Sequence, residues 1–280
     1  MIKRGRRIQL DRIIVGIDNI PSNGLKSEWG LSLFIEHGDK KILLDTGGSD
    51  LFLRNYAKLG LDISDVDYGV LSHAHCDHAN GIPAFFEHNS KAKFYVSEKT
   101  APDCYGNLLF IKFYCGIPKT MMDDHADRIV KVSDVYEISD GVFIVPHKKG
   151  GYPDIGKKGH MLRKTKAGFV ADDLCHEQSL VLATSHGLVI LNSCSHSGPG
   201  IVIDEVRKAF PDQHIYGYLG GLHLWNSSES DIRKVAHDLK AAGIDYIGTG
   251  HCTKNRAFGI LKEELGDKIE QFRTGLVIEF

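Results

Sequence analysis

Short apolar runs alternate with polar, glycine-rich stretches along most of this chain. The apolar runs predict strands at residues 12–17, 31–36, 41–44, 69–71, 93–96, 129–132, 142–145, 179–183, 188–191, 215–219, 246–247 and 276–280. Amphipathic spacing predicts helices at residues 51–59, 201–210, 231–242 and 257–265, and one that begins near Pro83. Strands that alternate with helices are typical of a layered α/β fold.

No linker separates the strand-rich first half from the strand–helix second half, so we expect a single domain over residues 1–280. Two segments interrupt the pattern. Residues 100–128 have no clear period and are interpreted as an insertion that covers a site. Residues 146–168 are expected to form a glycine-rich loop, either a flap that holds an anionic substrate or a solvated surface loop. Its charged residues are Lys148, Lys149, Lys157, Lys158, Arg163, Lys164 and Lys166, against Asp154.

The composition narrows the class of protein. The 280 residues include 42% hydrophobic and 25% charged residues, as in soluble globular proteins. A formal net charge of -2 argues against a general nucleic-acid binder, which carries a basic excess. Residues 1–7 are basic, but no apolar signal-peptide core follows, and no run approaches the ~18 apolar residues of a membrane helix. We therefore expect a cytoplasmic protein with no nucleic-acid and no membrane partner.

A cluster of metal-binding residue types follows the apolar run at residues 69–71. It contains His73, His75, Asp77 and His78. In an extended segment His73 and His75 point the same way, and the other two come one turn later. Imidazole and carboxylate together suit zinc, iron or manganese. A single histidine is commonly structural, but this density beside an aspartate predicts a metal site with two ligand pairs.

Histidines also follow three later strands. His196, His223 and His251 each lie in a loop of small residues after an apolar run, as His73 does. In layered α/β folds, ligands gather beyond the ends of the strands. We therefore expect these four loops to meet at one edge and to complete a site that no single motif contains.

The six cysteines form no Cys-x-x-Cys pair, which argues against a zinc ribbon. Cys76, Cys194 and Cys252 lie within two residues of a candidate metal-binding histidine. We interpret each as a small buried residue. A role as a metal ligand, as a neighbour of the ligands, or as an oxidation-sensitive thiol stays open.

Together these segments resemble the metallo-beta-lactamase superfamily. Leu-Leu-Asp-Thr-Gly at 43–47, the cluster at 72–81, Cys-Ser-His at 194–196 and Gly-His at 250–251 appear in that family's order. The resemblance implies a four-layer αββα sandwich with the metals at one edge of the paired sheets. It also implies the ligands: His73, His75 and His196 for a first metal, and Asp77, His78 and His251 for a second. Asp45 would support both.

Two further features refine the resemblance. Residues 220–224 and 249–253 are similar to a narrower group labelled 7,8-dihydropterin-6-methyl-4-(β-D-ribofuranosyl)aminobenzene-5′-phosphate synthase. The superfamily usually supplies a bridging aspartate at the end of the strand before His251, but here that strand ends in Gly220-Gly221-Leu222-His223. Either the second metal is weakly held, or His223 substitutes, or His223 contacts substrate. We favour the substrate contact.

The expected function is a metal-dependent hydrolase that uses metal-activated water on a small anionic, phosphorylated substrate. It would hold one or two divalent ions, zinc in the first place, with manganese or iron as alternatives. Asp77 would orient the water or act as base, and His223 would donate a hydrogen bond to the substrate. The alternative is a transferase that condenses a dihydropterin diphosphate with an aminobenzene ribofuranosyl phosphate. A homo-oligomer stays open.

Overall fold

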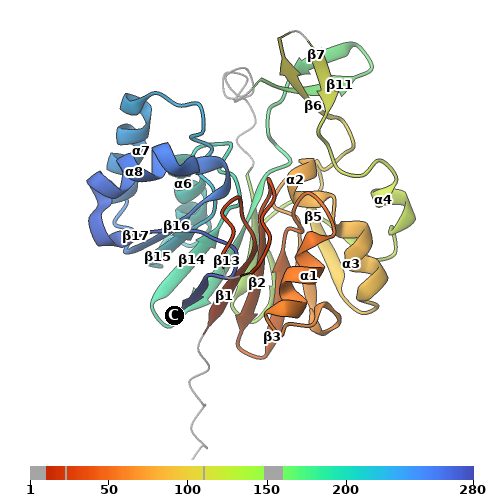
Figure 1. Cartoon of the computed structure of the whole chain (residues 1–280), viewed down its shortest axis with the longest axis horizontal. Helices are drawn as coiled ribbons and strands as arrows, with labels where there is room; N and C mark the ends of the chain where they lie inside the picture. Colours follow the sequence, from red (N-terminus) through yellow and green to blue (C-terminus); the bar gives the residue numbers. More distant parts are fainter. Residues whose placement is uncertain (1–10, 23, 110, 148–159) are drawn as a thin grey trace, which may run out of the picture.

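Two seven-stranded sheets pack face to face in the computed structural model, which describes residues 11–22, 24–109, 111–147 and 160–280 (Figure 1). The first sheet carries the N-terminal half of the chain and the last strand. Its order is β18 (Val277–Glu279), β1 (Arg12–Ile17), β2 (Ser32–His37), β3 (Lys40–Leu44), β4 (Tyr68–Val70), β5 (Lys93–Ser97) and β8 (Ile129–Val132).

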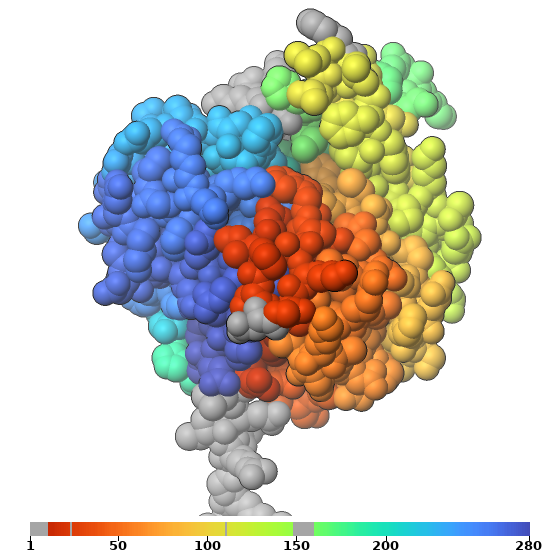
Figure 2. Space-filling view, in the orientation of Figure 1, coloured from red at the N-terminus to blue at the C-terminus, as the bar shows by residue number. Residues whose placement is uncertain are grey.

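The second sheet is built from the later part of the chain. Its order is β17 (Ile269–Gln271), β16 (Tyr246–Thr249), β15 (Ile215–Leu219), β14 (Gly187–Leu191), β13 (Gln178–Thr184), β10 (Val142–Pro146) and β9 (Tyr136–Ser139). Strands β9 and β17 were not predicted from the sequence. In Figure 2 the N-terminal half, in red to orange, lies directly beside the C-terminal part in blue.

Helices cover the outer face of each sheet (Figure 1). The first sheet is covered by α1 (Leu51–Lys58) and α3 (Ile82–His88), the second by α6 (Pro199–Ala209), α7 (Glu229–Ala241) and α8 (Lys254–Leu265). Three clusters of buried apolar side chains fill the spaces: one under α1 and α3, one between the sheets, and one under α6 to α8. The αββα sandwich is therefore confirmed. Short helical turns are α2 (Cys76–Ala79), α4 (Met121–Asp124), η1 (Ile63–Asp65), η2 (His251–Thr253) and η3 (Gly266–Lys268).

A third, four-stranded sheet corrects the interpretation of the two irregular segments. Its order is β12 (Gly168–Ala171), β11 (Met161–Thr165), β6 (Cys104–Leu108) and β7 (Ile111–Tyr114). The segment predicted as a basic loop through residue 168 thus becomes a hairpin from residue 161 and pairs with the predicted insertion. The sequence pattern missed it because much of β7 and β12 is exposed, which removes the alternation of apolar and polar residues. Lys148, Lys149, Asp154, Lys157 and Lys158 lie outside the described residues.

Parallel pairing brings the candidate loops to one edge. In the first sheet β3 and β4 are parallel, and in the second sheet β14, β15 and β16 are parallel. Asp45, His73, His196, His223 and His251 follow the carboxyl ends of these strands. Among the described residues, no helix combines the length and the apolar character that crossing a membrane requires.

Candidate metal centre

Three histidine rings meet at the edge of the sandwich, and we call them the first set: His73, His75 and His196. The ring centroids of His73 and His75 are 4.6 Å apart, and those of His196 lie 4.9 and 4.8 Å from them. All three Nε2 atoms are buried and have no hydrogen-bond partner among the described residues. Burying unpaired polar atoms is costly. The first set therefore fits a metal ion, which would take the free lone pairs.

Asp77, His78 and His251 form the second set beside the first. The Nε2 atoms of His78 and His251 face each other at 3.2 Å. The Oδ2 atom of Asp77 lies 3.5 Å from Nε2 of His251 and 3.8 Å from Nε2 of His78. The structure thus brings together the six residues that the sequence singled out as ligands, in the two groups expected from the resemblance.

Asp45 connects the two sets. Its Oδ1 accepts a hydrogen bond from the Ser72 amide at 2.7 Å, and its Oδ2 accepts one from the Ser72 hydroxyl at 2.6 Å and one from Nδ1 of His78 at 2.7 Å. The Ser72 hydroxyl oxygen lies 2.8 Å from Nδ1 of His73 and, because its own proton goes to Asp45, accepts a hydrogen bond from that nitrogen. These bonds place a ring proton on Nδ1 of each histidine and turn the Nε2 atoms of His73 and His78 inward.

Glu177 holds the loop that carries His196, and the sequence did not reveal it. Its carboxylate accepts hydrogen bonds from the backbone amides of His196 at 2.8 Å and Ser197 at 3.0 Å. Ser195, next to them, has a left-handed φ of 51°. A non-glycine residue in that region is strained and persists only where its surroundings hold it. Glu177 is one such restraint.

Asp18 and Asn19 hold His251 in the same way. Oδ1 of Asp18 accepts the His251 amide at 2.8 Å, and Nδ2 of Asn19 donates to the His251 carbonyl at 2.9 Å. His251 also has a left-handed φ, of 47°. Burial raises the pKa of the Asp18 carboxyl to about 6. Only the fold shows this role, because Asp18 lies more than two hundred residues from His251 in the chain.

The two sets differ in their electrostatics. Burial, followed by the neighbouring imidazoles, lowers the pKa of His73 and of His196 well below the ordinary value, and lowers the pKa of His75 to about 3. Burial also lowers the pKa of His78, but Asp77 and Asp45 outweigh it and raise the value to about 9. Burial opposes ionisation of Asp77, yet His78 and His251 lower its pKa. The first set is neutral, whereas the second is an ion pair network.

His176, which was not predicted to be a ligand, lies behind the first set. Its Nδ1 accepts the Ala74 amide at 3.1 Å, and its Nε2 lies 3.1 Å from Oδ2 of Asp172 and 3.7 Å from Sγ of Cys104. It braces the backbone between His73 and His75. His147 pairs with Glu205 instead, at 2.5 Å, and His160 is exposed.

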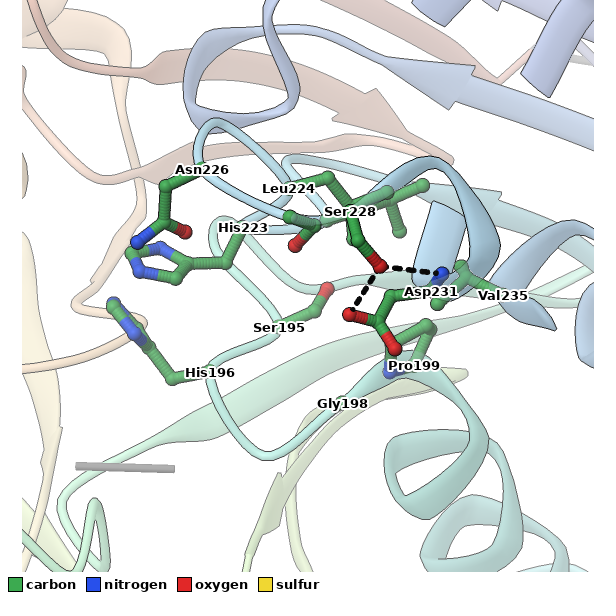
Figure 3. Close-up of a pocket in the computed structure, with 12 residues that line it drawn as sticks. Ser195, His196, Gly198, Pro199, His223, Leu224, Asn226, Ser228, Asp231 and Val235 are labelled. Carbon is green, nitrogen blue, oxygen red and sulfur yellow. Dashed lines mark hydrogen bonds between the residues drawn. The ribbon is translucent and has the colours of Figure 1, made fainter. Parts of the chain in front are cut away.

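The ring of His223 lies beside the first set. Its ring centroid is 4.1 Å from that of His196, and neither ring nitrogen has a hydrogen-bond partner among the described residues. Figure 3 shows the two rings pointing toward one another at one end of a pocket of about 360 Å³. Its φ of 48° is left-handed. His223 is therefore placed to contact a molecule bound next to the first set.

A second cavity, of about 280 Å³, opens onto both sets. His75, His196 and His251 line its inner end, together with Asp77 and His223. Its wall also carries large side chains that are partly exposed at the surface: Trp29, Phe113, Met161 and Trp225. Phe113 and Met161 come from the small third sheet, and Phe113 lies within residues 100–128, so this segment contributes to the wall of the cavity.

Known proteins resemble this chain over most of its length. Residues 30–156 match the family profile of the metallo-beta-lactamase superfamily. A curated protein of Methanocaldococcus jannaschii, named 7,8-dihydropterin-6-methyl-4-(beta-D-ribofuranosyl)-aminobenzene-5'-phosphate synthase, is 30% identical over 281 residues, which cover 91% of this chain and 90% of that protein.

Solved structures agree with this likeness. The crystal structure of Tm1679, described as a metal-dependent hydrolase of the beta-lactamase superfamily, has a TM-score of 0.82 and 28% identity, and the match covers 96% of this chain and 99% of that one. A diphosphatase from the PhnP family shares the fold, with a TM-score of 0.57 and 12% identity over 96% of this chain and 98% of its own. These likenesses concern the fold as a whole and not one motif.

Proposed function

This chain belongs to the metallo-beta-lactamase superfamily, and we propose that it is a metal-dependent hydrolase of a small anionic, phosphorylated substrate. The observation that carries the proposal is the first set, whose buried Nε2 atoms have no partner among the described residues. The first and second sets would hold one or two divalent ions, with zinc expected first because imidazole and carboxylate suit it. Bound there, such ions would activate water and polarise a substrate oxygen.

Asp77 and His223 would act on the substrate and the water. Asp77 is ionised and lines the cavity, so its carboxylate would orient the attacking water and accept its proton. His223 faces the same cavity, its ring nitrogens have no partner in the described part of the chain, and it would donate a hydrogen bond to a substrate oxygen that gains charge. The two side chains come from opposite sheets, so a substrate held between them would be oriented by both.

The wall of the cavity supports an anionic substrate with a flat apolar part. Trp29, Phe113 and Trp225 offer aromatic surface on which a planar group can pack. The ammonium group of Lys254 lies 4.2 Å over the ring of Trp29 and places a positive charge next to a side chain that lines the cavity. Such a cation attracts a phosphate or a carboxylate.

A second candidate function is a transferase that condenses a dihydropterin diphosphate with an aminobenzene ribofuranosyl phosphate. The name of the relative from Methanocaldococcus jannaschii and the aromatic wall of the cavity favour it. In that reaction a bond forms between the acceptor and the pterin methylene carbon, and pyrophosphate leaves. Asp77 would then accept a proton from the acceptor, and His223 would bind the departing phosphate.

Turnover assays on the zinc-loaded protein decide between the two. We expect hydrolysis of a phosphoester or phosphodiester, and we expect it to be lost when a chelator removes the metal and in the His73→Ala variant. Hydrolysis that persists in both would refute the hydrolase. Pyrophosphate released from the dihydropterin diphosphate only when the aminobenzene acceptor is present would favour the transferase.

A further inference from the structure

The sulfur of Cys194 lies between the first and second sets. Its Sγ is 3.2 Å from Nε2 of His78. It forms one group with ligand atoms of His73 and His196 and another with those of His78 and His251, where a group means atoms that all lie within 4.8 Å of one another. Cys194 thus lies near two histidines of the first set and two of the second, whereas Asp45 shares a group with only one histidine of each set. The side chain is buried and lines the inner end of the cavity between the sets.

An independent observation indicates that this position faces a ligand. The Nε2 atoms of His73 and His196, which share a group with the Cys194 sulfur, are buried and have no partner among the described residues. The sulfur and these two nitrogens are thus three donor atoms around one point. On the other side, the sulfur and the Nε2 atoms of His78 and His251 surround a second point.

The end of β15 cannot supply a side chain to this space. A Cβ atom at Gly220 would lie 1.8 Å from the carbonyl oxygen of Asn192, and one at Gly221 would lie 2.4 Å from Sγ of Cys252. The backbone there packs directly against the loop that carries Cys194. A carboxylate is therefore sterically excluded at both positions, and the sulfur of Cys194 occupies the space between the sets.

We propose that the thiolate of Cys194 is a metal ligand shared by the first and second sets. The inference rests on the metal centre of the proposed function and adds a ligand that neither the motif nor the likeness supplies. On coordination the sulfur gives up its proton to solvent. Because a thiolate is a soft ligand, it would favour zinc or iron over manganese or magnesium at this centre.

Cys252 provides a matched control. Its Sγ lies 3.5 Å from Sγ of Cys194 and accepts the His223 amide at 3.2 Å. It is as buried as Cys194 but belongs to no group with a histidine of either set. Replacing it with serine therefore changes the neighbourhood of Cys194 and leaves the proposed ligand in place.

The test is the absorption spectrum of the full-length protein loaded with cobalt(II), together with its cobalt and zinc content. We expect a thiolate-to-cobalt charge-transfer band in the near ultraviolet for the wild type and for Cys252→Ser, and none for Cys194→Ser. The zinc affinity of Cys194→Ser should fall by about 100-fold or more. Loss of a residue that only supports a ligand lowers metal affinity by about 10–100-fold, so loss of a ligand should reach or exceed the upper end of that range.

Several results would overturn the assignment of Cys194 as a ligand. Bound cobalt without the band in the wild type, a band that survives in Cys194→Ser, or a band lost in Cys252→Ser contradicts a Cys194 ligand but leaves the histidine sets in place. Wild type that binds no cobalt contradicts the metal centre itself. If Cys194→Ser fails to fold by circular dichroism, X-ray absorption of wild-type zinc protein decides: a sulfur neighbour at about 2.3 Å supports the ligand, and its absence excludes it.

Discussion

The first and second sets lie side by side but satisfy their polar atoms differently. In the first set, the Nε2 atoms of His73, His75 and His196 have no partner among the described residues, and burial keeps these rings neutral. In the second set, the residues pair with one another and with Asp45. Unpaired buried nitrogens cost free energy that only a ligand can recover. The first set therefore depends on a bound ion, whereas the second is largely satisfied without one.

Replacing one predicted ligand in each set should show the largest difference between the two sets. We expect His73→Ala to lose the ion of the first set and to lower turnover by about 1,000-fold or more, since a metal supplies several kcal/mol of transition-state stabilisation. His251→Ala should keep that ion and lose less activity. Metal content by mass spectrometry and initial rates measure both, and the exposed His237→Ala serves as control. A larger loss in His251→Ala would reverse the comparison.

Removing the metal should destabilise the protein mainly through the first set. Zinc at about 100 times its dissociation constant stabilises the folded state by about 2.7 kcal/mol, which raises the melting temperature by roughly 5–10 °C. We expect that shift for the wild type and for His251→Ala, and little of it for His73→Ala. Differential scanning fluorimetry with and without a chelator measures it. Equal shifts in the two variants would show that the sets do not differ.

Asp45 contacts both sets, so its replacement should weaken both. In Asp45→Asn the side chain keeps its shape but loses its charge, and one of its two acceptor oxygens becomes an NH2 group that cannot accept a hydrogen bond from Ser72 or His78. We expect zinc affinity to fall by about 10–100-fold, the usual effect of losing a residue that supports ligands. Competition with a chromophoric chelator measures it, with the exposed Asp50→Asn as control. Unchanged affinity would mean that Asp45 does not orient these rings.

Replacing Glu177 should weaken zinc binding in the first set alone, and by less than the changes above. Glu177→Gln leaves one carbonyl to accept a backbone amide, so either His196 or Ser197 loses its acceptor. One unpaired buried amide costs about 1–3 kcal/mol. We expect about tenfold weaker zinc binding in the first set and no change in the second. The same chelator competition, repeated in a His251→Ala background that leaves only the first set, detects it. An undiminished affinity there would contradict the role of Glu177.

The sequence predicted the residues that a local pattern marks. The cluster from His73 to His78 is dense enough to stand out, and strands that end in a histidine loop could be recognised one at a time. Parallel pairing of those strands then brings the loops to one edge, which is why the grouping could be expected. The ligand roles themselves remain predictions.

Other features depend on contacts between distant segments. Asp18 and Glu177 act on His251 and His196 through backbone amides, and nothing in their own neighbourhoods indicates it. The third sheet joins two segments that each lack a clear period. The place of Cys194 between the two sets appears only when the loops after β4, β14 and β16 are folded together. Patterns in the sequence indicate which residues are buried, whereas these roles depend on contacts between segments that lie far apart in the chain.

The most direct test of the central claim is anomalous X-ray diffraction above the zinc absorption edge, on crystals of the zinc-loaded full-length protein. We predict one strong peak within bonding distance of Nε2 of both His73 and His196, and a second, weaker one beside Nε2 of His78 and His251. Zinc-loaded crystals with no peak at the first position would contradict the account.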